Sequence, residues 1–350
     1  MPFNIIRNDI TTLRVDAIVN AANTSLRMGG GVCGAIFCAA GADRLQGACN
    51  SLAPIKTGEA VITQGFDLPA RYIIHTAGPV YIDGQHDEES LLRTCYMNSL
   101  ELALKHDCES VAFPLISSGI YGYPEAGALR VASTAIRDFI SQHDVDVTLV
   151  IFGKTPLAFD EGLRGAVKSY IGKHYTANDI CVEERQVRGR GFPGLETIAF
   201  SGQKMMRSSM PAPMSECAAA DLIAVPKSAK IDNLIKNLDE PFSATLMRLI
   251  DETGKKDAEI YRRANIDRRL FSKIRSNAHY MPSKPTALAF AVALELSLDK
   301  TEDLLERAGF ALSHSRIFDI IVEYFIKNRK YDIYEINEVL FSYDQPLLGG

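Results

Sequence analysis

Apolar and polar positions alternate between two patterns in the first half of the chain. Short runs rich in Val and Ile, such as residues 15–20 (VDAIVN) and 147–153 (VTLVIFG), predict buried strands. Between such runs, apolar residues recur with helical spacing, as in residues 89–106 and 125–143. This alternation is typical of an α/β fold with a mostly parallel sheet covered on both faces. The other strands are expected within residues 3–13, 60–65, 72–78 and 110–116.

The pattern changes after about residue 175. The next segment is rich in Gly, Pro, Ser and Met without a period, which predicts a linker that is partly disordered. The remainder is helical throughout: Gly254 suits a helix end, Asp267 suits an N-cap, and residues 283–298 are apolar enough to form a core helix. We therefore expect a three-layer α-β-α domain with a mixed, mostly parallel sheet at 1–175, a linker at 176–239 and a small all-α domain at 240–350.

Composition excludes several classes of protein. The chain of 350 residues is 47% hydrophobic and 23% charged, as in ordinary soluble proteins. It has no run of about 18 apolar residues and no signal-peptide pattern at its N-terminus. The seven cysteines show no CxxC spacing, which favours reduced thiols in the cytoplasm over disulfides or a metal site.

Charge is informative only locally. The net charge of -5 is not that of a general nucleic-acid binder. Residues 260–284, however, hold seven basic side chains against one acidic side chain. Such a cluster is either a solvated helix face or a surface that contacts nucleic acid.

Two glycine-rich loops follow predicted strands. Gly29, Gly30 and Gly31 come after the strand at 15–20 and before a helix expected to begin near Val32. Backbone N–H groups and a helix N-terminus at such a place suit phosphate. A second loop, residues 117–124 (SSGIYGYP), offers serine hydroxyls and two more glycines before another helix.

Parallel sheets bind ligands at the carboxyl ends of their strands, so two such loops could hold a diphosphate between them. Alternatively, the glycines only make tight strand-to-helix turns. The chain has neither a P-loop lysine after the glycines nor a GxGxxG fingerprint, which argues against nucleoside-triphosphate and nicotinamide-dinucleotide sites.

Five motifs in this order resemble a macrodomain of the MacroD type. They are NDIT (8–11), VDAIVNAAN (15–23), GGGV (29–32), YIIHTAGP (72–79) and AFPLISSGIYGYP (112–124). The resemblance covers about half of the chain. It implies a protein that binds ADP-ribose and removes it from modified proteins or from O-acyl-ADP-ribose, with no cofactor required.

The resemblance also implies roles for individual residues. Asp9 would accept a hydrogen bond from the adenine amino group, with Ile10 giving a backbone contact and Phe152 lying against the ring. Asn23 would hold the hydroxyls of the distal ribose, and Tyr121 would form its wall. The phosphate loops would be Gly30, Gly31 and Val32 on one side, and Ser117, Gly119, Ile120, Tyr121 and Gly122 on the other.

The chain departs from the MacroD pattern at one position. Where that pattern has GGGVDG, this chain has GGGVCG, so Cys33 replaces an aspartate that would act as a general base or hold the distal ribose. Cys33 is either an inert lining residue, or a thiolate favoured by the helix N-terminus, or a bystander while the ligand's own phosphate activates water. The candidate catalytic residues are Asn23, Cys33 and Tyr121. His75, inside an apolar strand, is interpreted as a core histidine, and Asp16 and Asn20 as structural hydrogen-bonding residues.

The C-terminal half is similar in pattern to the helix-turn-helix domains of phage-repressor-like regulators. Residues 267–277 (DRRLFSKIRSN) would then be the recognition helix, contacting DNA through Arg268, Arg269, Lys273 and Arg275. The alternative is a protein-interaction module with charged helix faces.

Two functions remain open at this point. The first is an ADP-ribosyl hydrolase, and the second is a non-catalytic ADP-ribose reader coupled to a DNA- or protein-binding helical domain. They differ mainly in what Cys33 can do. We favour the hydrolase, because every other motif follows that branch.

Overall fold

The structure is a computed structural model that describes residues 2–152, 161–174 and 240–349. The predicted linker at 176–239 lies outside the described residues. The described residues before and after that segment belong to one compact unit. Within the described ranges, we find no helix with both the length and the hydropathy needed to cross a bilayer.

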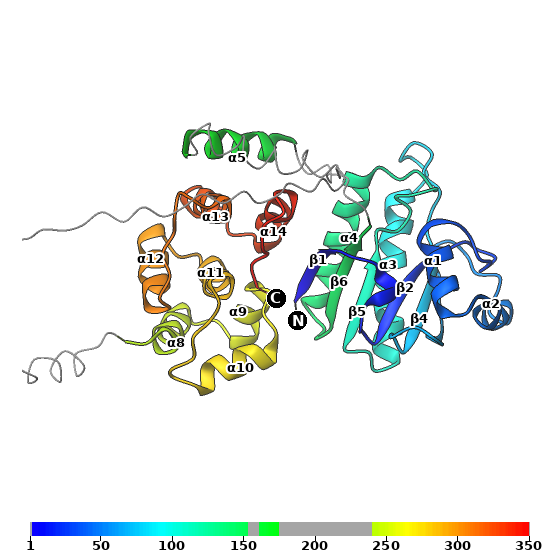
Figure 1. Cartoon of the computed structure of the whole chain (residues 1–350), viewed down its shortest axis with the longest axis horizontal. Coiled ribbons are helices and arrows are strands. Elements are labelled where there is room, and N and C mark those ends of the chain that lie inside the picture. The colour runs from blue at the N-terminus through cyan, green and yellow to red at the C-terminus, as the bar shows by residue number, and fades with distance from the viewer. Residues whose placement is uncertain (1, 153–160, 175–239, 350) are drawn as a thin grey trace, which may run out of the picture. The chain divides into compact units, whose positions relative to one another are not determined.

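Within the described residues, six strands form one sheet in the order β1-β6-β5-β2-β4-β3, and Figure 1 shows β1, β6, β5, β2 and β4 side by side. Only β3 runs antiparallel to its neighbour, β4, whereas the other neighbouring strands are parallel. The predicted mixed, mostly parallel sheet is therefore confirmed. The strands are β1 (Phe3–Arg7), β2 (Ala17–Ala22), β3 (Ala60–Gln64), β4 (Tyr72–Ala77), β5 (Ser110–Pro114) and β6 (Asp146–Ile151).

Helices cover both faces of the sheet, because successive side chains of a strand point to opposite sides. In β2, Val19 is buried with residues of α3 and α4, whereas Ile18 is buried with residues of α1 and α2. The central strands are thus apolar on both faces, as the sequence predicted, and the three-layer arrangement is confirmed. The helices are α1 (Gly31–Ala40), α2 (Ala42–Asn50), α3 (Glu88–Lys105) and α4 (Glu125–Ile140).

The C-terminal region is helical, as expected. Gly254 ends the first of its helices in the left-handed conformation, and the Asp267 side chain accepts a hydrogen bond from Arg269 N–H as an N-cap. Every residue of the predicted core helix from Ala287 to Ala293 is buried. The helices are α8 (Phe242–Thr253), α9 (Asp257–Arg263), α10 (Arg268–Ser276), α11 (Lys284–Ala293), α12 (Leu298–Arg307), α13 (Ile317–Lys327) and α14 (Ile333–Ser342).

One helix has a role that the sequence did not indicate. Helix α5 (Glu161–His174) falls inside the segment predicted as the first domain, but Val167 and Ile171 lie in the hydrophobic core of the helical region. Tyr170 donates a hydrogen bond to Glu323 of α13 at 3.3 Å. Apolar contacts therefore join α5 to α13, while the exact domain limits remain predictions.

Candidate ligand-binding site

The first glycine loop is shaped by close backbone packing. Gly31 begins α1 with φ of +61°, a conformation that side chains with a Cβ rarely adopt. A Cβ on Gly34 would lie 2.6 Å from the carbonyl oxygen of Gly29, so the loop packs directly on the first turn of the helix. The unpaired N–H groups of that first turn are consequently available at the loop.

The Asn23 side chain stabilises this loop through hydrogen bonds to other loop residues. Its Nδ2 donates to the carbonyl oxygen of Arg27 at 2.8 Å, and its Oδ1 accepts from Ser25 Oγ at 2.8 Å and from Arg27 N–H at 3.1 Å. The side chain assigned to the distal ribose by resemblance therefore also fixes residues 24–28. Replacing Asn23 would disturb the loop as well as any ligand contact.

The second loop follows β5 and contains a strained serine. Ser117 has φ of +64°, a region uncommon for residues other than glycine and often seen at functional sites. Its side chain is buried, and its Oγ has no hydrogen-bond partner among the described residues. Beyond it, Gly122 N–H donates to the carbonyl oxygen of Gly119, and Tyr81 N–H donates to that of Tyr121, each at 2.9 Å.

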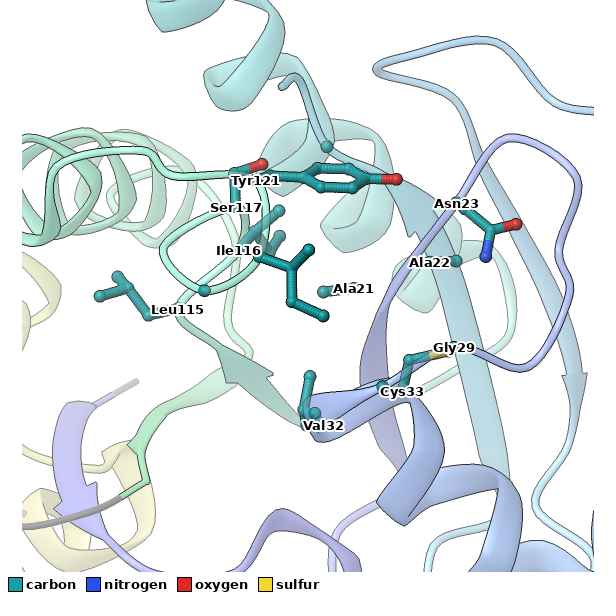
Figure 2. A pocket seen from close by; sticks show the side chains of 15 residues that line it. Ala21, Ala22, Asn23, Gly29, Val32, Cys33, Leu115, Ile116, Ser117 and Tyr121 are labelled. Carbon is teal, nitrogen blue, oxygen red and sulfur yellow. The ribbon is translucent and has the colours of Figure 1, made fainter. Parts of the chain in front are cut away.

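The two loops face one another across a cavity of about 200 Å³. The two loops approach each other closely, since a Cβ on Gly30 of the first loop would lie 3.3 Å from Ile120 Cδ1 of the second. In Figure 2 the ring of Tyr121 extends from the second loop toward the side of the cavity where Asn23 lies. The predicted residues that line this cavity are Asn23, Gly30, Gly31, Val32, Cys33, Ser117, Gly119, Ile120 and Tyr121.

A second cavity of about 380 Å³ adjoins the first. Both are lined by Gly31, Val32, Leu115 and Gly119, so together they form a continuous depression at the carboxyl end of β5. The second cavity is lined by three of the four remaining predicted residues, namely Asp9, Ile10 and Phe152. Gly122 lines neither cavity, and its part is to shape the turn.

Residues of the second cavity differ in exposure. The Oδ1 atom of Asp9 accepts hydrogen bonds from the N–H and Oγ1 of Thr11, so this carboxylate caps the short helix η1 (Ile10–Thr12). Ile10 is buried, whereas Phe152 is 85% exposed. An exposed phenyl ring beside an open cavity is available to stack on a planar ligand group.

Cys33 lies at the base of the first cavity and is 4% exposed. Among the described residues that line this cavity, none is Asp, Glu or His, and only Cys33 and Tyr121 have titratable side chains. Cys33 Sγ lies 3.6 Å from Nδ2 of Asn20, which in turn lies 3.0 Å from Nδ1 of His75. General acid–base chemistry from protein groups is therefore limited at this cavity.

The interpretation of His75 as a core histidine is confirmed, since its side chain is fully buried and burial lowers its pKa to about 4. Asp16 is also structural, because Oδ2 accepts hydrogen bonds from the N–H groups of Glu109 and Ser110. Sequence reasoning missed the link from His75 through Asn20 to Cys33. The two polar residues stand on different strands, and a single sequence gives no signal of that pairing.

One group in the described ranges has the composition of a metal site, namely Asp83, His86 and Glu88. The Glu88 carboxylate already accepts hydrogen bonds from N–H groups of the 82–86 loop. Burial opposes its ionisation, but these N–H groups outweigh that effect and lower the pKa of Glu88 to about 2. The carboxylate thus holds the loop, and we assign no metal to it.

Three of the basic side chains of α10 have partners within the protein. Arg269 contacts Glu109 at 2.9 Å, Arg275 forms an ion pair with Asp257, and Lys273 lies over the ring of Tyr280. The structure supplies no contact that tests the predicted role of these residues, or of Arg268, in binding DNA. That role remains a prediction.

Comparison with known proteins gives matches to the half of the chain that carries both glycine loops. A family model described as "Macro domain" matches residues 19–132. An O-acetyl-ADP-ribose deacetylase of Escherichia fergusonii is 50% identical over 144 residues, which cover 40% of this chain and 81% of the relative. The ADP-ribose glycohydrolase MACROD1 of Bos taurus is 48% identical over 149 residues, which cover 42% of this chain and 46% of that protein.

Among solved structures, the chain matches the Oceanobacillus iheyensis macrodomain with ADP, with 40% identity and a TM-score of 0.41. That match covers 48% of this chain and 91% of the other. None of the reported matches assigns the C-terminal helical region to a helix-turn-helix family. The 50% identity to the Escherichia fergusonii protein, 81% of whose length is matched, shows that the chain belongs to the macro domain family.

Proposed function

We propose that the macro domain binds ADP-ribose, with the pyrophosphate held between the two glycine loops. The observation that carries this proposal is the pair of adjoining cavities between those loops. Backbone N–H groups at the start of α1 favour an anion there. The buried, unpartnered hydroxyl of Ser117 adds a hydrogen-bonding group that a ligand would satisfy.

The two cavities suit the two ends of such a ligand. The adenosine end would occupy the larger cavity, where Asp9 can accept a hydrogen bond and Phe152 offers an exposed ring. The distal ribose would occupy the smaller cavity beside Asn23, Cys33 and Tyr121. The names of relatives, an O-acetyl-ADP-ribose deacetylase and an ADP-ribose glycohydrolase, support the same ligand class.

The reaction we propose is hydrolysis that releases ADP-ribose from a modified protein side chain or from O-acyl-ADP-ribose. Water adds to the ester or glycosidic linkage, and the acceptor or acid leaves with a proton. Because no carboxylate is found among the described residues that line the smaller cavity, we expect the ligand's own phosphate or the Cys33 sulfur to accept the proton from water. We therefore expect slower turnover than a carboxylate acting as general base would give.

The lack of a carboxylate among the described residues of the smaller cavity also favours one alternative, a reader that binds ADP-ribose without turnover. The binding and turnover experiment described next tests both proposals. Tight binding without release of free ADP-ribose would establish the reader and exclude the hydrolase.

The experiment has a binding step and a turnover step. Calorimetry of the full chain with ADP-ribose should give a saturable heat, weakened in Gly30→Val, whose side chain would press on Ile120. Gly47→Ala, in open space on α2, is the matched glycine control and should leave binding unchanged. Incubation with Glu/Asp-, Ser- and Arg-linked ADP-ribosylated proteins and with O-acetyl-ADP-ribose, following free ADP-ribose, then identifies the substrate. No binding heat in the wild-type protein would refute the proposal.

A further inference from the structure

A chain of buried hydrogen bonds lies directly behind the smaller cavity. Asn20 on β2 stands opposite His75 on β4 in the sheet register, and both side chains are fully buried. Asn20 Nδ2 lies 3.0 Å from His75 Nδ1, and His75 Nε2 lies 2.9 Å from Thr63 Oγ1. Cys33 Sγ, at the cavity end, lies 3.6 Å from the same Asn20 Nδ2.

The direction of each hydrogen bond follows from the neutral ring. Since the pKa of His75 is about 4, the imidazole carries one proton at neutral pH. Nδ1 faces the Asn20 amide, which has only donors on that nitrogen, so Nδ1 accepts and Nε2–H donates to Thr63. Thr63 Oγ1 can then donate to the carbonyl oxygen of Gln64, 3.3 Å away.

Because His75 Nδ1 accepts from one N–H of the Asn20 amide, the second N–H is left for the Cys33 sulfur. A primary amide has two donors, and His75 receives one of them. The other is directed at Cys33 Sγ, which therefore accepts. A sulfur that accepts on its buried side has its own S–H bond free to turn to the cavity.

The cavity side of Cys33 borders the place proposed for the distal ribose. A Cβ on Gly29 would lie 3.9 Å from both Cys33 Sγ and Asn23 Nδ2, so the thiol and the amide flank one small space. Figure 2 shows Cys33 and Asn23 on the same side of the cavity as Gly29. A second, independent sign of a ligand in this cavity is the buried Ser117 Oγ, which has no partner in the described ranges.

We propose that Asn20 and His75 are positioning residues that fix the Cys33 sulfur as a hydrogen-bond acceptor, so that its S–H group donates to a ribose oxygen of the bound ligand. The inference rests on the proposed ADP-ribose site and assigns the thiol a specific part in it. Cys33 is then neither inert nor the base of the reaction. It is a donor that selects for an oxygen at that point of the ligand.

The first test is a double-mutant cycle on ADP-ribose affinity, measured by calorimetry on the full chain. Cys33→Ala should weaken binding about 2- to 10-fold, and Cys33→Ser, which keeps a donor, should weaken it less. Asn20→Ala should reduce the affinity for ADP-ribose by a similar factor. It should cause no further loss in a protein that already carries Cys33→Ala, because both changes remove the same interaction. Cys49→Ala is the matched control, since Cys49 touches His75 at 3.8 Å without lining either cavity.

Two outcomes of this cycle overturn the inference. If the losses from Asn20→Ala and Cys33→Ala are additive, Asn20 acts only through the general structure of the sheet. If Cys33→Ser weakens binding as much as Cys33→Ala does, the sulfur is not a hydrogen-bond donor to the ligand.

A second test separates failure of this inference from failure of the ligand assignment. The rate at which methyl methanethiosulfonate modifies Cys33 at one fixed pH, followed by peptide mass spectrometry, needs no ADP-ribose. Because an N–H donor stabilises negative charge on the attacking sulfur, Asn20→Ala should slow this reaction, and Cys49→Ala should not. An unchanged rate in Asn20→Ala overturns the hydrogen bond itself, whereas a slower rate without ADP-ribose binding in the wild type would refute only the proposed function.

Discussion

Replacing Cys33 by aspartate should increase the rate of hydrolysis. In the part of the chain that the structure describes, no carboxylate lines the smaller cavity, and position 33 is the third residue of α1, at its N-terminal turn. A carboxylate there would receive the Asn20 N–H that now faces the sulfur and would be favoured by the helix dipole, each effect being worth about 1 kcal/mol. These interactions offset part of the cost of burying the charge, so the aspartate should be ionised near neutral pH.

The expected gain follows from the chemistry of a general base. Such a group contributes typically about 100- to 10,000-fold in rate, or about 3 to 5 kcal/mol of barrier. Aspartate places its carboxylate oxygens one bond farther from the backbone than the Cys33 sulfur, in a cavity shaped around the shorter thiol, and we therefore expect the lower end of this range.

The assay is single-turnover release of free ADP-ribose from an ADP-ribosylated acceptor by the full chain. Cys33→Asn is the control, since asparagine has the shape of aspartate but its amide cannot act as a general base. If Cys33→Asp is no faster than Cys33→Asn, the missing carboxylate does not limit the reaction. A rate below that of the wild type would instead show that the thiol has a catalytic role of its own.

Three further predictions follow from the site. Gly34→Ala should weaken ADP-ribose binding more than tenfold in calorimetry, because its Cβ would meet the Gly29 carbonyl oxygen at 2.6 Å and displace the first loop, and unchanged affinity would contradict that packing. Ser117→Gly should raise the melting temperature, because it removes a strained conformation costing about 1 kcal/mol, yet weaken ADP-ribose binding about 2- to 10-fold by removing the hydroxyl. For His75, the pKa in the folded protein is about 4 against 6.5 for the free side chain, so the unfolded chain binds a proton that the folded chain does not. The free energy of unfolding should therefore fall by up to about 3 kcal/mol between pH 6.5 and pH 4, and urea denaturation of His75→Gln should lack this part of the pH dependence.

Much of the local structure was predictable because its causes are local. Alternating apolar runs predicted both faces of β2, Gly254 and Asp267 predicted a helix end and a helix start, and the apolar run from Ala287 predicted a core helix. The two glycine loops were also visible, since each follows an apolar run and precedes a helical period. Their meeting at one edge follows from parallel strands, whose carboxyl ends lie together.

Other features depend on residues far apart in the sequence. Helix α5 could not be assigned to the helical core from its own amphipathic pattern, because that pattern does not name a partner. Asn23 was predicted as a ligand-binding side chain, but only the folded loop shows that its amide is used by Arg27 and Ser25. Hydrogen bonds of this kind depend on the geometry of the folded loop, which cannot be derived from a single sequence.

The amino-acid sequence by itself determined the strand and helix pattern, the glycine loops and the cysteine at position 33. Only the tertiary structure decided what surrounds that cysteine. Asn20 and His75 are 55 positions apart and meet because β2 pairs with β4 in one particular register. A shift of β4 by one residue against β2 would turn His75 to the other face of the sheet, away from Asn20, and the environment of the thiol would be lost.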